Sequence, residues 1–93
     1  MTANSEQRLA ATLLQLARKL GKRNLRSLKI ENHISHQELS DMVGTTRTRI
    51  GQFMQRFCEM GLIERSTGRA LIIKEHPLAE YLETRGYVLR QLH

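Results

Sequence analysis

Two short apolar repeats separated by a glycine constrain the fold of this chain more than any other feature. Ser35 and Glu38 form a capping box, in which a serine begins a helix and a glutamate three residues later bonds back to it. Gly44 ends that helix after about two turns. The apolar residues expected to face inward are Leu39, Met42 and Val43.

A second helix follows the glycine almost immediately. Thr45 and Thr46 can cap its start, and Gly61 ends it. Its expected inward face, which follows the helical repeat, is Ile50, Phe53, Met54, Phe57 and Met60. Two helices joined by such a short turn form a helix-turn-helix, whose second helix is predicted to span about residues 46–60.

The segment before these helices predicts a further helix and a short strand. Asn4 and Gln7 form another capping box, which opens a helix that Gly21 ends. Its apolar stripe consists of Leu9, Ala10, Leu13, Leu14, Leu16, Ala17 and Leu20. Leu28 and Ile30 alternate with polar residues and predict a short strand.

The segment after them predicts a β-hairpin and a last helix. Two apolar stretches around a glycine-containing tip indicate a hairpin over about residues 63–74. Pro77 suits the first turn of the last helix. Its expected inward face is Leu78, Tyr81 and Leu82. With 93 residues, the chain is expected to form a single mainly α (α+β) domain over residues 1–93, with a core of about residues 5–82 and a tail of residues 83–93.

The balance of charge points to nucleic acid. Lysine and arginine number 15 against 9 acidic residues, which gives a formal charge of +6 and an isoelectric point of about 10.3. Arginine, which binds phosphate and guanine through paired hydrogen bonds, supplies 11 of the 15. An anionic membrane surface is the second class of partner that such a charge allows. The basic residues gather at the end of the first helix, on the helix of residues 46–60 and at the hairpin tip.

Several classes of protein are excluded or disfavoured. No apolar run approaches the roughly 18 residues of a membrane span, and the first residues are too polar for a signal peptide. A single cysteine, Cys58, excludes an intrachain disulfide, and we expect a cytoplasmic location. His33 and His36 lack a nearby third metal ligand, and no nucleophile–base spacing or glycine-rich phosphate loop is present. We therefore expect no enzyme, no metal and no cofactor.

The outward face of the helix of residues 46–60 is small and polar. A helical wheel places on it Thr48, Gly51, Gln52, Gln55 and Glu59, with Arg47 and Arg49 on its flanks. Its first two turns carry no acidic side chain, which suits insertion into a DNA major groove. Gly51 either allows close approach to DNA or packs against the preceding helix, and the sequence supports both interpretations.

Three runs of the sequence carry a family resemblance: ISHQELSDMVGTTRTRI at residues 34–50, MGLIE at residues 60–64 and SEQRLA at residues 5–10. Together they resemble the DNA-binding domain of the cyclic-AMP receptor and fumarate–nitrate regulator (Crp/Fnr) family, over about residues 5–82. The resemblance implies a winged helix-turn-helix: a three-helix core, a β-hairpin wing and here an extra C-terminal helix. It also implies sequence-specific binding of double-stranded DNA in bacterial transcription regulation, with the recognition helix in the major groove and the wing on the backbone.

The resemblance implies roles for individual residues. In that family the first residues of the recognition helix contact bases, which points to Arg47, Thr48 and Gln52. Family members commonly carry Arg, Glu and Arg there, and only Arg47 matches, so the best-known half-site of the family is not expected. Chemically, Arg47 suits guanine, Gln52 suits adenine and Thr48 suits a thymine methyl. The implied phosphate contacts are Ser35, Gln37, Thr45, Thr46, Arg49 and, at the wing tip, Arg69.

Double-stranded DNA is thus the expected partner, with a homodimer and RNA polymerase as further candidates and no membrane contact. The sensor domain and long dimerisation helix usual in the family are not among these 93 residues, so no cyclic nucleotide, haem or cluster is implied for them.

The alternative hypothesis is a winged helix for protein interaction with weak DNA affinity. Its contact would be the apolar part of the tail, Tyr87, Val88, Leu89 and Leu92. RNA binding is disfavoured because few aromatic residues are available for stacking.

Overall fold

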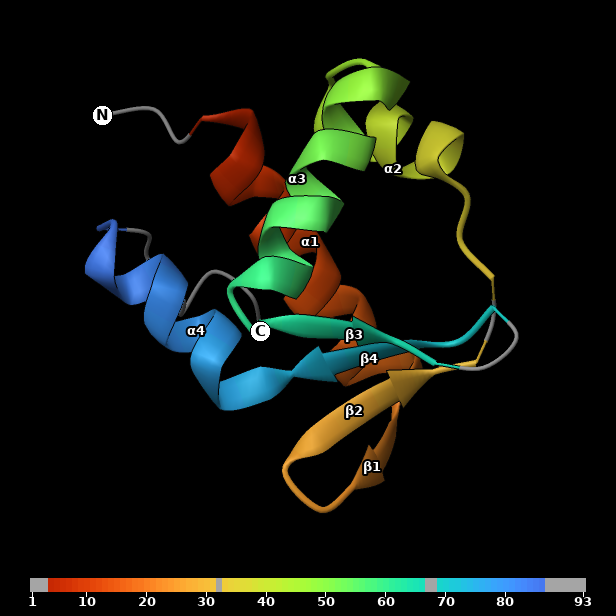
Figure 1. Ribbon diagram of the computed structural model, residues 1–93, viewed down its shortest axis with the longest axis vertical. Helices are drawn as coiled ribbons and strands as arrows, with labels where there is room; N and C mark the ends of the chain where they lie inside the picture. Colours follow the sequence, from red (N-terminus) through yellow and green to blue (C-terminus); the bar gives the residue numbers. More distant parts are fainter. Residues whose placement is uncertain (1–3, 32, 67–68, 87–93) are drawn as a thin grey trace.

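The computed structural model describes residues 4–31, 33–66 and 69–86 of the chain. The helices are α1 (Ser5–Leu20), α2 (His36–Val43), α3 (Arg47–Glu59) and α4 (Glu75–Thr84). The strands are β1 (Lys22–Asn24), β2 (Ser27–Ile30), β3 (Ile63–Arg65) and β4 (Leu71–Lys74). Figure 1 shows α2 and α3 together at one end of the molecule and the β1–β2 hairpin at the other. This architecture confirms the predicted winged helix-turn-helix, and α3 and the β3–β4 wing lie within the predicted ranges.

The described strands form one antiparallel sheet in the order β1-β2-β4-β3. Ile73 in β4 lies opposite Ile63 of β3 on one side and Leu28 of β2 on the other, and all three are buried. The sheet therefore ties the wing to the segment that follows α1. The sequence predicted β2 but not β1, because all three residues of β1 are exposed and no apolar alternation marks the strand.

The core gathers around α1, as the central position of this helix in Figure 1 suggests. Its stripe contributes Leu9, Ala10, Leu13, Leu14 and Ala17, each with 0% of its surface exposed. From the other elements the core takes residues such as Ile30, Leu39, Ile50, Phe57, Leu78 and Leu82. The predicted inward faces of α3 and α4 are thus largely correct.

Three residues predicted to face inward are exposed instead. Leu20 is 50% exposed, Met42 is 55% exposed and Met60 is 44% exposed. Leu20 is the last residue of α1, Met42 is next to the last residue of α2 and Met60 is the C-cap of α3. The helical repeat thus predicts burial at these terminal positions that the neighbouring elements do not provide.

The helix ends follow the predicted capping chemistry. Both capping boxes are present, Asn4 with Gln7 and Ser35 with Glu38. Thr46, rather than Thr45, is the N-cap of α3, and its hydroxyl accepts a hydrogen bond from the backbone N–H of Arg49 at 3.2 Å. These caps fix where α2 and α3 begin, and hence which side chains lie on their first turns.

The two glycines that end α1 and α2 do so for different reasons. Gly44 has a φ of +82°, in the left-handed region, which lets the chain turn sharply from α2 into α3. Gly21 is extended rather than left-handed, but a Cβ there would collide with the carbonyl oxygen of Ala17. Gly44 is therefore required for its backbone conformation and Gly21 for lack of space.

Candidate DNA-binding surface

The helix-turn-helix is held on the rest of the domain by its buried face and by polar bonds. Leu39 and Ile50 are nearly fully buried, and the Nε of Arg8 in α1 donates a hydrogen bond to the carbonyl of Val43 at 3.2 Å. That carbonyl belongs to the last turn of α2, where the orphan carbonyls of a helix need donors. The orientation of α2, and with it that of α3, is thus fixed against α1.

The three predicted base-contact residues lie on the outward face of α3, and their side chains make no contacts with other described residues that would occupy them. Arg47, Thr48 and Gln52 are all exposed, and no intramolecular partner engages their side chains within the described parts of the chain. They occupy the first turns of a helix whose opposite side is packed into the core. Further along the same face, Gln55 donates to the carboxylate of Glu59 at 3.4 Å. The part of α3 that is free to bind a ligand is its N-terminal half.

The predicted phosphate contacts near the helix starts are partly occupied by local bonds. The hydroxyls of Ser35 and Thr46 accept capping hydrogen bonds, but each keeps its own proton to donate. The side-chain nitrogen of Gln37 donates to the hydroxyl of Ser40 at 3.3 Å and to the carboxylate of Asp41 at 3.1 Å, so one of these bonds has to break before it can donate to a phosphate. Thr45 is half-buried in the turn. The cap hydroxyls are therefore better prepared as donors than Gln37.

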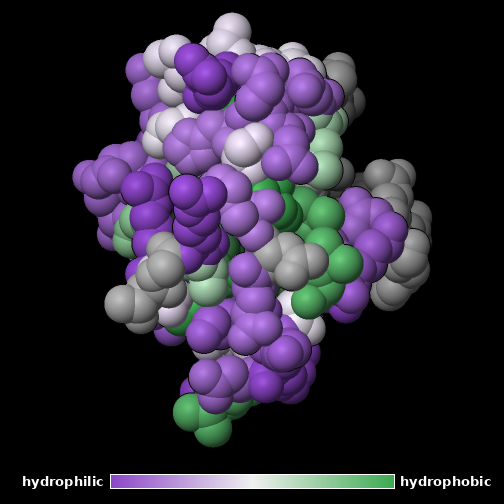
Figure 2. Space-filling model, turned by 90° about the vertical axis from the view of Figure 1, so that its right-hand side faces the viewer, coloured by the Kyte–Doolittle hydropathy of each residue, from purple (hydrophilic) through white to green (hydrophobic). Residues whose placement is uncertain are grey.

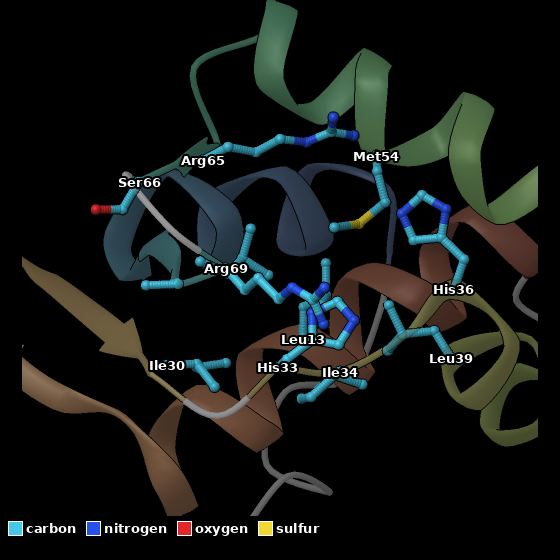
Figure 3. Close-up of a pocket in the computed structure, with 12 residues that line it drawn as sticks. Leu13, Ile30, His33, Ile34, His36, Leu39, Met54, Arg65, Ser66 and Arg69 are labelled. Carbon is cyan, nitrogen blue, oxygen red and sulfur yellow. The ribbon is translucent and has the colours of Figure 1, made fainter.

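The two predicted phosphate-contacting arginines differ in their surroundings. The guanidinium of Arg49 lies 5.5 Å from the centre of the Phe53 ring, a cation–π contact that holds it against α3. Arg69 is exposed, and Figure 3 shows its side chain extending from the wing across a pocket rather than away from the protein. Arg49 is thus restrained along its helix, whereas Arg69 has to swing outward to meet a phosphate.

His36 marks the point where α2, α3 and the wing meet, and the sequence pattern assigned it no role. Its pKa is lowered, first because it is partly buried and then because Arg65, His33 and Arg47 place positive charge near it. Arg65 belongs to β3 and Arg47 to α3, so the start of α2 lies within electrostatic range of both. The surface is electropositive where the three elements converge, and Arg65 joins the candidate site as a residue that was not predicted.

Gly51 faces the same histidine. A Cβ added to Gly51 would lie 3.7 Å from Nδ1 of His36, an ordinary packing distance. Gly51 therefore lies beside the start of the preceding helix. Because that distance also accommodates an alanine, close packing alone does not require glycine here.

Comparison with known proteins identifies the family of this domain. The profile of the Crp-like helix-turn-helix domain matches residues 7–83. The chain belongs to this family. Its helix-turn-helix is accordingly of the kind that serves transcription regulators as a DNA-binding domain. No curated protein matches the sequence.

Solved structures of Crp-like regulators share the fold. The CO-dependent transcription factor CooA from Carboxydothermus hydrogenoformans, in its imidazole-bound form, has 31% identity and a TM-score of 0.73 over 85% of this chain and 37% of the CooA chain. A CooA mutant from the same organism gives 30% identity and a TM-score of 0.78 over 88% and 38%. A CRP-family transcriptional regulator from Thermus thermophilus has the same fold at 23% identity, with a TM-score of 0.72 over 88% and 42%. The chain thus spans less than two-fifths of the CooA chains.

The described part of this Crp-like domain holds no group of three or more potential metal ligands. Cys58 is a free, half-buried thiol. None of the helices in residues 4–31, 33–66 and 69–86 combines the length and apolar character needed to cross a membrane. Tyr87, Val88, Leu89 and Leu92, the predicted protein contact, lie outside the described residues.

Proposed function

We propose that this chain binds double-stranded DNA sequence-specifically, with the N-terminal half of α3 in the major groove. The observation that carries the proposal is the unengaged, exposed and acid-free start of α3, where Arg47, Thr48 and Gln52 project from a helix anchored in the core. A rigid helix with free polar side chains on one face is what base recognition requires, because B-DNA's major groove admits one helix. The match to the Crp-like family supports this use of the helix.

Each of the three side chains has a base that it suits. Arg47 can donate two parallel hydrogen bonds to O6 and N7 of guanine, and Gln52 can pair with N6 and N7 of adenine. The methyl group of Thr48 can contact the methyl group of thymine. Because only Arg47 retains the family's common residue, the preferred half-site differs from the best-known one at the positions that Thr48 and Gln52 read.

The phosphate contacts surround this face. Ser35 and Gln37 at the start of α2, together with Thr45, Thr46 and Arg49 around the start of α3, are the proposed donors to one side of the groove. Arg69 on the wing is the proposed contact to the backbone on the other side. Such contacts set the register of the protein on DNA without carrying sequence information.

The oligomeric state and further partners belong to the same proposal. CRP-family regulators act as dimers, and we propose that two copies of this helix-turn-helix read two half-sites about one turn of DNA apart. Residues 1–93 are proposed to act as one DNA-binding unit, with RNA polymerase as a further candidate partner. A single winged helix is expected to bind DNA weakly, so pairing of two copies supplies part of the affinity.

Selection from a random pool of duplex DNA tests the proposal. The purified chain is mixed with the pool, bound duplexes are amplified over several rounds, and the survivors are sequenced. An enriched motif is expected, and a palindromic motif indicates a dimer. If no motif emerges and the dissociation constant stays in the non-specific range of about 10⁻⁴ to 10⁻⁶ M, sequence-specific reading is contradicted and the protein-interaction hypothesis gains.

A further inference from the structure

A pocket of about 250 Å³ lies between the helix-turn-helix and the wing, beside the candidate DNA-binding surface. Leu13 of α1, Ile30 of β2, Leu39 of α2 and Met54 of α3 form its floor, and all four are buried. Half-buried Ile34 and Leu71 form part of its walls. Elements from across the fold therefore contribute to one apolar cavity, and none of the three proposed base contacts lines it.

The mouth of this pocket is cationic. Arg65 of β3 and Arg69 of the wing line it, together with His33 and His36. Figure 3 shows the side chains of Arg65 and Arg69 reaching over the pocket from the wing side. Among the described lining residues there is no aspartate or glutamate, and neither arginine has a carboxylate partner in the described part of the chain. The site thus pairs an apolar floor with uncompensated positive charge.

We propose that this pocket binds a small aliphatic carboxylate. Ligand sites are commonly apolar cavities in which a few polar groups fix the orientation, and arginine binds a carboxylate through two parallel hydrogen bonds. The carboxylate head lies between Arg65 and Arg69 at the mouth, and the chain lies against Leu13, Ile34 and Met54. The apolar lining residues are all aliphatic or thioether side chains, which favours an alkyl chain over an aromatic ring.

Size restricts the ligand further. The volume falls below the roughly 300 to 1,000 Å³ of drug-sized ligand sites, so the pocket suits a ligand of about ten non-hydrogen atoms. A nucleotide is both larger and more polar than this cavity accommodates. A medium-chain fatty acid has the matching combination of one negative charge and a short alkyl chain.

Occupation of the pocket has a consequence for DNA binding, and this consequence rests on the proposed function. Arg69 is the proposed wing contact to phosphate, and Arg65 contributes to the positive potential beside α3. A carboxylate bound between them neutralises part of that potential and holds Arg69 over the pocket. We therefore expect the occupied domain to bind DNA more weakly than the empty one.

Octanoate is the probe, and the backbone amide resonances of the full chain report its binding in the absence of DNA. We expect saturable shifts concentrated at Ile34, Met54 and Leu71, with a dissociation constant of about 1 mM, given its size. The double variant Arg65→Ala plus Arg69→Ala should weaken binding by about tenfold or more. Arg26→Ala, which removes an exposed arginine from the distant β1–β2 turn, is the matched control and should leave binding unchanged.

Two further probes separate the contributions of charge and chain. If 1-octanol binds as tightly as octanoate, the arginines do not recognise the carboxylate and the proposal is overturned. If inorganic phosphate shifts the same amide resonances with equal affinity, the arginines bind an anion without any contribution from the apolar floor. That result overturns the proposal. Shifts that are absent, or spread evenly over the surface, also overturn the site.

A separate DNA-binding measurement distinguishes failure of this inference from failure of the proposed function. Octanoate should weaken DNA binding by the wild-type chain but not by the double arginine variant. If octanoate binds while DNA affinity stays constant, the pocket stands and its link to DNA is wrong. If the chain binds no DNA at all, the amide titration still decides whether the pocket takes a carboxylate.

Discussion

The two ends of the molecule use their arginines differently. Where α4 meets α1 and β1, Arg18 and Arg23 both bind the carboxylate of Glu75, at 3.1 and 2.8 Å. On the helix-turn-helix and wing, whose surface appears in part in Figure 2, Arg47, Arg49, Arg65 and Arg69 have no carboxylate partner within the described residues. The first pair holds together segments more than fifty residues apart in the sequence. The second group is left for a partner outside the chain.

A second cluster of paired side chains joins α3 to α1 and α4. Glu6 of α1 accepts a hydrogen bond from the hydroxyl of Tyr81 at 2.5 Å and pairs with Arg56 at 3.3 Å. The guanidinium of Arg85 lies 3.8 Å from the centre of the Tyr81 ring. α3 thus carries an arginine paired with α1 in its last turn and arginines without a described carboxylate partner at its start. We therefore expect variants at the paired clusters to change stability and variants at the unpaired arginines to change DNA affinity.

The largest expected effect on stability comes from Tyr81→Phe. Tyr81 is 4% exposed, and burial followed by the bond to Glu6 raises its pKa to about 12. Removing the hydroxyl takes a donor from a partly buried carboxylate, which should lower the free energy of unfolding by about 1.5–3 kcal/mol. Urea denaturation measures the loss. DNA affinity should be unchanged. An equal loss of stability and of DNA affinity would show that the Tyr81 cluster also supports DNA binding.

Glu75→Gln should destabilise the domain less, by about 1 kcal/mol, because its ion pairs are only partly buried. The bond from Arg23 is the main cause that lowers the pKa of Glu75, and Arg18 adds to it. Because the pKa is lower when folded, this stabilisation is present above the unfolded value of about 4.3 and is lost as the pH falls through the folded value. Thermal unfolding at pH 7 and below pH 4 should therefore show the difference between wild type and variant shrinking in acid.

Arg69→Ala and Arg26→Ala compare two exposed arginines at opposite ends. Arg69→Ala should weaken binding to all duplexes alike and lower the slope of log affinity against log salt by about one, since one phosphate contact is lost. Arg26 also has no carboxylate partner among the described residues, as is true of Lys19. If Arg26→Ala changes the slope equally, the basic β1–β2 end also touches DNA and the division between the two ends is wrong.

The smallest effect is expected in the titration of His36. Its pKa in the free protein is below the usual 6.5, with burial as the first cause and the neighbouring cations next. Bound DNA brings phosphates next to Arg65 and Arg47, which offsets that positive charge, so the pKa should rise in the complex. The imidazole proton resonances followed against pH measure both values. A pKa that falls further on binding would place the DNA elsewhere.

Much of the fold could be predicted from the sequence because local chemistry specifies it. The capping boxes at Asn4 and Ser35 and the glycine at position 44 mark the helix ends through bonds between residues a few positions apart. The wing followed from two apolar stretches around a turn. Such signals need no knowledge of distant segments.

The remaining features depend on contacts between distant segments. No local sequence pattern indicates that Glu75 pairs with arginines from α1 and β1, or that Tyr81 donates a hydrogen bond to Glu6. The exposure of Met42 and Met60 likewise depends on where the neighbouring elements end. On the candidate site, the helix pattern identified Arg47 and its neighbours, but Arg65 and His36 appear only when β3 and α2 are brought together.

The sequence specificity of Arg47→Ala on the selected duplex tests directly whether the start of α3 reads bases. Affinities of the wild type and the variant are measured on the selected sequence, on its single-base variants and on random duplex, at one salt concentration. We expect Arg47→Ala to lose about 1–3 kcal/mol of binding free energy on the selected sequence and much less on random DNA, with relaxed preference at one base pair. An equal loss on both duplexes, with every base preference retained, would show that the start of α3 holds the backbone and does not read the sequence.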